Sequence, residues 1–243
     1  MKINIITIFP DMFTAPFNHS IMKRAQEKKL LTIETVNPRD FAQDKHQMVD
    51  DYPFGGGAGM VLKPEPMFAA VESLKTSGKK RVLLMCPSGQ PFTQEKAKEL
   101  AQYDELIFLC GHYEGFDARI TDNLVDEAIS IGDYVLMGGE IPAMVILESV
   151  SRLIPSVVGK ESFLKERIKN KNKKKGFLEY PNYTRPPIFE PGKFLQEIKK
   201  EELVLKGKKI KKTSKIKWTV PDILISGNHK KIEEWRTENG KII

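Results

Sequence analysis

Residues 105–117 read ELIFLCGHYEGFD, an unbroken apolar run that ends in a glycine-bounded turn. A run of strand length that is apolar at successive positions, not at alternate ones, is typical of a strand buried on both faces of a sheet. Lys2–Phe9, Leu31–Val36 and Arg81–Cys86 are further short runs rich in apolar and β-branched residues. These four segments therefore predict the strands of one sheet.

Segments with helical spacing of apolar residues lie between or after these strands. In Glu65–Lys75, for example, Met67, Val71 and Leu74 fall on one face of a helix. The other segments of this kind are Met12–Lys28, Gln94–Gln102 and Ile141–Leu153. Strands that alternate with helices predict the α/β class, with a mostly parallel sheet and helices on both of its faces.

The composition is that of an ordinary folded protein. The chain has 243 residues, of which 40% are hydrophobic and 29% are charged, and this balance excludes wholesale disorder. No apolar run approaches the roughly 18–20 residues of a membrane helix, and the opening segment Met1–Phe9 lacks the cleavage site of a signal peptide. Cys86 and Cys110 make no disulfide framework, and no Cys/His spacing suits zinc. We therefore expect a cytoplasmic protein with no membrane partner and no metal ligands.

The net charge of +7 is very unevenly spread along the chain. Residues 1–159 carry 16 Lys and Arg against 21 Asp and Glu, whereas residues 160–217 carry 19 against 7, and the remainder is balanced at 4 of each. Two runs, Lys165–Lys175 and Lys206–Lys217, hold most of the basic excess. Such clustering favours a nucleic acid as partner, because each neutralised phosphate releases counterions. A solvated lysine-rich surface is the alternative.

The strand–helix alternation stops after Gly159. The run Lys165–Lys175 has no hydrophobic period and predicts a linker. Beyond it the chain predicts a small, mainly helical domain, with helices over Gly192–Leu205 and His229–Glu238.

Three glycine-rich stretches are candidates for a binding site. Gly55–Gly59 fits neither a P-loop, which needs Gly-Lys-Ser/Thr, nor a dinucleotide fingerprint, and a plain tight loop is as good an interpretation. The stretches Gly111–Asp117 and Ser130–Glu140 are more informative, because ligands of open α/β sheets lie on such turns beyond the strand ends. Between Gly111 and Glu140 the chain carries one basic residue, Arg119, against seven acidic ones: Glu114, Asp117, Asp122, Asp126, Glu127, Asp133 and Glu140. An acidic, glycine-rich pocket suits a cationic or neutral ligand with a nucleoside part.

Several motifs together carry a resemblance to a known family. In order along the chain they are YPFGGGAGM at 52–60, CGHYEGFD at 110–117, IGDYVL at 131–136, GGE at 138–140, Ile154-Pro155, YTRP at 183–186 and SGNH at 226–229. With these motifs the sequence resembles the bacterial tRNA (guanine-N1)-methyltransferases, the TrmD family of the SPOUT class.

The resemblance implies a fold and an activity that composition and periodicity do not reach. It implies a SPOUT-type parallel sheet with a deep trefoil knot as domain 1–158, a linker over 159–178, and a C-terminal tRNA-binding domain over 179–243. The implied activity is methylation of guanosine at N1, at position 37 of tRNA, which maintains the reading frame. S-adenosylmethionine is the implied cofactor, the implied assembly is a homodimer, and a need for Mg²⁺ stays open.

The cofactor site of the family transfers onto three segments of this chain. The resemblance places it in the knot loops, at Leu84, Pro87, Gly89, Gly111, Tyr113, Glu114, Gly115, Ser130, Ile131, Gly132, Asp133, Tyr134, Val135, Leu136, Gly138 and Gly139.

The catalytic residues transfer less cleanly. The family has an Asp before Ser-Phe as its proposed general base and an Arg just before Ile-Pro; here Glu161 and Arg152 take those places. Glu161 is one methylene longer than Asp, and a lysine-rich insertion follows it, so Glu166 or a solvated linker is the alternative interpretation. For Arg152 the alternative is a structural pairing at the dimer interface.

Three residues are implied in binding the tRNA: Glu179, Tyr183 and Arg185. A surface carboxylate is the alternative for Glu179. Two other functions stay open at this point: an RNA-binding homologue without catalytic activity, which the Glu at 161 makes thinkable, and a SPOUT enzyme that acts on another RNA.

Overall fold

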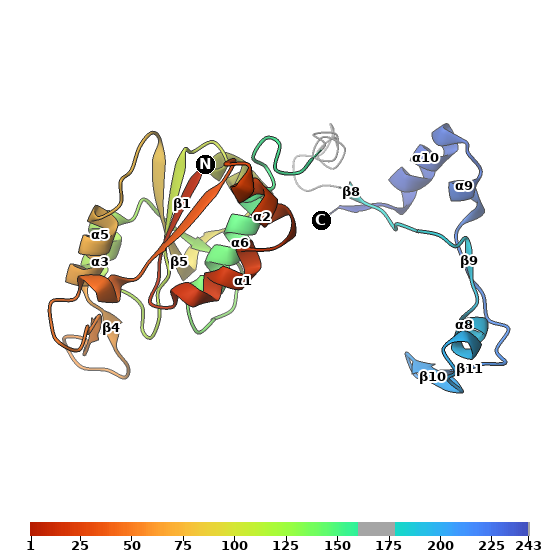
Figure 1. Cartoon of the computed structure of the whole chain (residues 1–243), viewed down its shortest axis with the longest axis horizontal. Coiled ribbons are helices and arrows are strands. Elements are labelled where there is room, and N and C mark those ends of the chain that lie inside the picture. The colour runs from red at the N-terminus through yellow and green to blue at the C-terminus, as the bar shows by residue number, and fades with distance from the viewer. Residues whose placement is uncertain (160–177, 243) are drawn as a thin grey trace. The chain divides into compact units, whose positions relative to one another are not determined.

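The computed structural model describes residues 1–159 and 178–242. The chain divides into two compact units, Met1–Lys165 and Glu166–Ile243, each of which is described by itself (Figure 1). The predicted linker, 159–178, lies outside the described residues except at its two ends. Among the described residues, no helix has both the length and the apolar character needed to cross a membrane.

A five-stranded, entirely parallel sheet forms the centre of the first unit. Its strands are β1 (Lys2–Ile6), β2 (Thr32–Val36), β5 (Lys80–Pro91), β6 (Glu105–Leu109) and β7 (Glu127–Ser130), in the order β2-β1-β6-β5-β7. The four predicted strands are confirmed. Strand β7 was not predicted, because its four residues, EAIS, are too short and too polar to show a strand pattern.

Strand β6 occupies the middle of the sheet, and all five of its residues are buried. Leu106 and Phe108 face one hydrophobic cluster and Ile107 and Leu109 face another. The continuous apolar run in the sequence therefore has the predicted cause, a strand covered on both faces.

Helices cover both faces of the sheet. The first cluster receives side chains from α1 (Thr14–Phe17), α2 (Ser20–Glu27), α4 (Gln94–Leu100) and α6 (Glu140–Ser151), and the second from α3 (Pro64–Glu72) and α5 (Ala118–Leu124). Figure 1 shows α3 and α5 on one side of the strands and α1, α2 and α6 on the other.

Two short 3-10 helices and a small strand pair are the other elements of residues 1–159. They are η1 (Pro10–Phe13), η2 (Pro38–Phe41), and the antiparallel pair of β3 (Asp50–Asp51) with β4 (Val61–Leu62).

The predicted helix over Met12–Lys28 is wrong as a single element. The chain forms η1, α1 and α2 in succession, and it changes direction at Asn18–Ser20, where Ser20 has a φ of +51°. A positive φ interrupts the right-handed helical backbone, and the apolar spacing does not reveal it.

Over its described residues, 178–242, the second unit is made of short elements. These are β8 (Leu178–Glu179), β9 (Ile188–Phe189), α8 (Pro191–Glu197), β10 (Glu202–Leu205), β11 (Lys208–Lys211), β12 (Trp218–Thr219), α9 (Asp222–Ile225), α10 (His229–Asn239) and β13 (Lys241–Ile242). The predicted helix over His229–Glu238 is confirmed as α10. The predicted helix over Gly192–Leu205 is too long, because 202–205 pairs with 208–211 around a Lys206-Gly207 turn in which both residues have positive φ.

The central position of β6 leads to a stability prediction. Phe108→Ala should lower the free energy of unfolding by about 3–5 kcal/mol, because Phe108 is fully buried and its removal leaves a cavity. Phe54→Ala is the matched control: Phe54 is fully exposed, and its removal should change stability by less than about 0.5 kcal/mol. Urea unfolding followed by circular dichroism measures both, and equal effects would contradict the assignment of β6 to the core.

Candidate functional site

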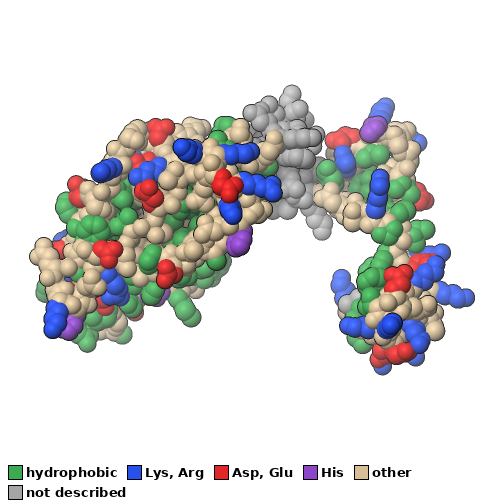
Figure 2. Space-filling model, in the orientation of Figure 1, with side chains coloured by type: hydrophobic (Ala, Val, Ile, Leu, Met, Phe, Trp, Pro, Cys, Tyr) green, Lys and Arg blue, Asp and Glu red, His purple; other side chains and the backbone are tan. Residues whose placement is uncertain are grey.

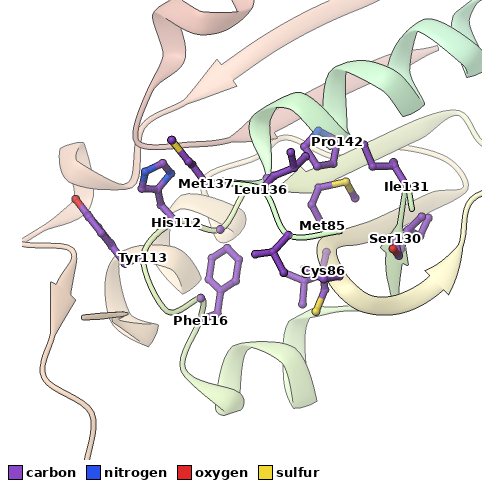
Figure 3. Close-up of a pocket in the computed structure, with 18 of the residues that line it drawn as sticks. Met85, Cys86, His112, Tyr113, Phe116, Ser130, Ile131, Leu136, Met137 and Pro142 are labelled. Atoms are coloured by element: carbon purple, nitrogen blue, oxygen red, sulfur yellow. The ribbon is translucent and has the colours of Figure 1, made fainter. Parts of the chain in front are cut away.

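A cavity of about 390 Å³ lies where three segments of the first unit meet. Its walls come from Leu84–Pro87 in β5, residues 111–116 after β6, and residues 129–132 and 134–139 at and after the end of β7, and Thr121 and Pro142 complete them. Figure 3 shows Met85 and Cys86 on one side of the cavity, opposite His112 and Phe116.

The cavity brings together nearly all of the residues expected to bind the cofactor. Of these, only Gly89 and Asp133 are outside the lining. Asp133 is exposed, and Gly89 packs against the backbone of Ala128, where it lines a separate surface cavity with Arg81 and Lys96.

Four lining residues fall outside the cofactor segments that the resemblance implies, 84–89, 111–115 and 130–139. They are Phe116, Thr121, Ile129 and Pro142. Phe116 belongs to the quoted CGHYEGFD motif and was within reach of sequence reasoning, whereas Thr121 and Pro142 reach the cavity from α5 and α6, which only the tertiary packing shows.

The two glycine turns touch each other at the cavity. The Gly139 N–H donates to the Gly111 carbonyl at 2.8 Å, and His112 forms an isolated antiparallel bridge with Gly138. A Cβ on Gly139 would lie 2.8 Å from the Cα of Cys110 and 2.9 Å from the Gly111 nitrogen. These neighbours are backbone atoms that cannot swing aside, so the contact requires glycine at position 139.

The turn after β6 is held in an uncommon backbone conformation. Tyr113 has a φ of +58° and Gly115 has a φ of +96°. Hydrogen bonds join this turn to the residues that follow the glycine-rich loop: the Glu114 N–H donates to the Met60 carbonyl at 3.0 Å, and the Leu62 N–H in β4 donates to the Gly115 carbonyl at 2.9 Å. The Gly55–Gly59 loop is outside the lining but its last residue packs against the wall, since a Cβ on Gly59 would collide with the Glu114 side chain.

The pocket is less acidic than the sequence suggested. Glu114 is the one carboxylate in its lining, which contains no Lys or Arg and is otherwise largely apolar. Glu140 is buried behind the lining and is not part of it. Asp117 binds Arg119, whose guanidinium lowers the pKa of that carboxyl to about 2, and Asp126 and Glu127 line the separate cavity with Lys96. Counting neighbours in the sequence therefore overstated the number of carboxylates in the lining of this cavity.

The expected catalytic residues are not placed at this cavity by the described structure. Arg152 is exposed and directly follows α6. Glu161 lies outside the described residues, as does its alternative Glu166. Within the described part of the chain, no group of three or more His, Cys, Asp or Glu side chains is arranged to hold a metal ion.

The expected tRNA-binding residues belong to the second unit. Glu179 is in β8, opposite Lys241 of β13. Tyr183 and Arg185 line a cavity of about 1190 Å³ that also includes Tyr180, Trp235 and Arg236. The Tyr183 and Trp235 ring centroids are 6.3 Å apart, and the Arg236 guanidinium lies 4.9 Å from the centroid of Tyr180.

Comparison with known proteins identifies the family of this chain. The sequence model of the tRNA (guanine-1)-methyltransferase TrmD matches residues 1–215. The chain belongs to this family. Its relatives include the tRNA (guanine-N(1)-)-methyltransferase of Staphylococcus aureus (strain JH9), which is 50% identical over 238 residues, and that of Staphylococcus haemolyticus (strain JCSC1435), which is 48% identical over 238. Each alignment covers 98% of this chain and 85% of the relative. The TrmD match spans the whole cavity of the first unit.

The glycine contact makes a prediction for ligand binding. Gly139→Ala should weaken the binding of S-adenosylmethionine at least tenfold, because the added Cβ forces the two turns apart. Gly159→Ala is the control, since a Cβ there meets nothing within 4 Å. Isothermal titration measures both affinities, and an unchanged affinity of the Gly139→Ala protein would contradict this account of the pocket.

Proposed function

We propose that this protein transfers the methyl group of S-adenosylmethionine to N1 of guanosine 37 in tRNA. Membership of the TrmD family supports the reaction, and one structural observation carries the assignment of the site: the two glycine turns that touch at Gly111 and Gly139 enclose a cavity in the family-matched unit. We assign donor binding to residues 1–158 and tRNA binding to 179–243, joined by 159–178, in a cytoplasmic enzyme.

The residues of the cavity fit S-adenosylmethionine. Its volume of about 390 Å³ is in the range of small-molecule sites. Gly138 and Gly139 bring bare backbone to the wall, where a Cβ at either position would collide with a neighbouring turn. Apolar side chains such as Leu84, Ile131 and Leu136 suit an adenine ring, and Glu114 offers one negative charge. We expect Mg²⁺, if the reaction needs it, to be bound elsewhere than in this lining.

The chemistry requires a base and a cation from this chain. S-adenosylmethionine supplies an electrophilic methyl group on a positively charged sulfur. Guanine N1 carries a proton at neutral pH, so a carboxylate must accept that proton as N1 attacks. Negative charge then develops toward guanine O6, where a guanidinium stabilises it. We assign these roles to Glu161 and Arg152 from the family resemblance.

The second unit offers features that suit tRNA. Lys208, Lys209 and Lys211 are exposed around the buried Ile210 on β11, and Figure 2 shows blue Lys and Arg side chains gathered around this hairpin. The aromatic and Arg side chains around Tyr183 can stack on an unpaired base, which is how single-stranded RNA is commonly bound. Lysines for phosphates and rings for bases therefore occur in the same unit.

The outer face of α6 supports a homodimer. Its exposed side chains Ile141 and Val145, with Met137 beside the helix start at 91% exposure, form a short apolar stripe. The charged residues Glu148 and Arg152, the latter directly after the helix, continue the same face with helical spacing. An apolar stripe of this kind on a folded unit is typical of an interface with a second copy. Pairing along this stripe would bring Arg152 into the interface.

The experiment that tests the proposed function is the site-resolved analysis of methylated bulk tRNA. The protein with S-adenosylmethionine should produce 1-methylguanosine at position 37 in tRNAs that carry guanosine there. Donor binding without any methylated product would favour the RNA-binding alternative, and product in ribosomal RNA alone would favour a different SPOUT substrate.

Glu161→Gln should lower the rate of methyl transfer at saturating donor by a hundredfold or more, because the amide cannot accept the N1 proton. Its affinity for S-adenosylmethionine should stay within twofold of the wild type. Glu166→Gln is the matched control and should keep the wild-type rate. A rate lost in Glu166→Gln and retained in Glu161→Gln would transfer the role of base to Glu166.

Arg152→Ala should likewise slow transfer far more than it weakens donor binding.

Val145→Asp should convert a dimer into a monomer, because it introduces a charge into the apolar stripe of α6. Sedimentation equilibrium measures the mass directly. Glu95→Gln, an exposed change on α4, is the control. A Val145→Asp protein that sediments at the wild-type dimer mass would show that this stripe is not the interface.

A further inference from the structure

Glu140 is a buried carboxylate directly beneath the cavity. It is the first residue of α6, it is 2% exposed, and it is absent from the lining of the pocket. A buried glutamate is costly unless it is paired or hydrogen-bonded, so its contacts indicate what it does.

The two oxygens of Glu140 connect separate parts of the chain. The Thr7 hydroxyl, just beyond β1, donates to Oε1 at 2.8 Å, with both groups buried. Oε2 lies 3.8 Å from Nδ1 of His112, which belongs to the turn after β6 and lines the cavity. The Glu140 carboxylate therefore contacts Thr7, next to the sheet, and faces His112, in the lining of the cavity.

Glu140 also lies against the second turn. A Cβ on Gly138 would be 2.4 Å from Oε2 of Glu140 and 2.5 Å from Nδ1 of His112. Gly138 therefore packs against both Glu140 and His112, next to the hydrogen bond between Gly139 and Gly111. The carboxylate is below the point at which the two turns touch.

The imidazole of His112 is held by its surroundings on several sides. Its ring packs edge-on against Phe9, at 4.9 Å, and Tyr113, at 5.2 Å between centroids. Its Nδ1 is buried and has no hydrogen-bond partner within the described part of the chain, and Oε2 of Glu140 faces it at 3.8 Å. The pKa of the buried Cys110 thiol is well above its usual value. Burial is the main cause, and the negative charge of Glu140 adds to it.

We propose that Glu140 is a positioning residue for methyl-donor binding, which orients His112 and holds the two glycine turns at their contact. The inference rests on the proposed function, since the donor is the ligand that the turns enclose. Glu140 acts on the shape of the pocket and not through its charge on the ligand, because the His112 ring and the Gly138 backbone lie around it and Glu114 is the carboxylate in the lining.

The binding of two ligands distinguishes a residue that shapes the pocket from a residue that attracts a charged ligand. S-adenosylmethionine carries a positive sulfonium, and S-adenosylhomocysteine has the same frame with a neutral sulfur. A residue that shapes the pocket should affect both ligands equally, whereas a residue that attracts the sulfonium should affect the cation more. Glu140→Gln should therefore raise the dissociation constants of both ligands by the same factor. We expect about tenfold, which is the scale of one hydrogen bond to a charged group, here the bond from Thr7 to Glu140.

The state of the His112 ring is a second readout that needs no ligand. In the wild type the carboxylate favours the tautomer with a proton on Nδ1, because the group facing one ring nitrogen selects the tautomer. Long-range proton–nitrogen NMR should show this tautomer for His112 in the free protein, and Glu140→Gln should reduce its population. The spectrum has four histidines to assign, His19, His46, His112 and His229.

Glu95→Gln is the matched control for removal of a charge. Glu95 is likewise in the first turn of a helix, α4, but it is exposed and outside the pocket lining. Its affinities for both ligands and the His112 tautomer should equal those of the wild type.

Thr7→Val and Thr7→Ser test the same network if Glu140→Gln folds poorly. Valine removes the hydroxyl at nearly constant volume and should weaken both ligands, whereas serine keeps the donor and should retain wild-type binding.

The outcomes separate this inference from the proposed function. Equal tenfold losses with a changed His112 tautomer support it. Affinities within twofold of the wild type in Glu140→Gln, or a loss for the sulfonium alone, overturn the inference and leave the proposed function intact. A wild-type protein that binds neither ligand overturns both. Donor binding without methylation of tRNA overturns the proposed function alone.

Discussion

The contact between two glycine turns is the constraint on which the site depends. Gly111 follows the central strand β6 and Gly139 precedes α6, and their backbones meet at a hydrogen bond of 2.8 Å. No side chain larger than hydrogen fits at position 139, since a Cβ there would collide with backbone atoms of the opposite turn. Because the sheet fixes one turn and the packed helix α6 fixes the other, the cavity between them is a property of the folded core and not of two free loops.

The cavity and the basic residues of the chain lie in different parts of the sequence. The cavity of the first unit has no Lys or Arg in its lining, whereas the excess of basic residues lies in 160–217. A cationic donor and a polyanionic tRNA need opposite surroundings, and separate parts of one chain meet these needs without mutual repulsion at either site. Within the first unit the buried Glu140 serves geometry and the lining residue Glu114 supplies the local negative charge.

Much of the fold could be predicted from the sequence, and the predictions that were wrong have physical causes. The apolar run of β6 and the spacing of Met67, Val71 and Leu74 predicted a buried strand and the helix α3, because burial imposes these periods directly. The break before α2 depends on a positive φ at Ser20, and the β10–β11 hairpin depends on pairing between strands; neither is visible in local hydrophobicity.

The glycine motifs predicted the lining of the cavity better than the count of acidic residues predicted its charge. The glycine turns identified most of the lining, but Thr121 and Pro142 enter from helices whose position only packing decides. Counting acidic residues between Gly111 and Glu140 gave too negative a pocket, because neighbours in sequence such as Asp117 and Glu127 bind their own basic partners on other surfaces. The roles of Glu161 and Arg152 stay predictions from the resemblance to the TrmD family.

Hydrogen–deuterium exchange of the wild-type protein with and without S-adenosylmethionine tests the central claim most directly. The account predicts slower exchange of backbone amides in residues 111–116 and 130–139, and exchange in 180–240 unchanged by the donor alone. Unchanged exchange in both glycine turns at a saturating donor concentration, or protection confined to the second unit, would contradict it.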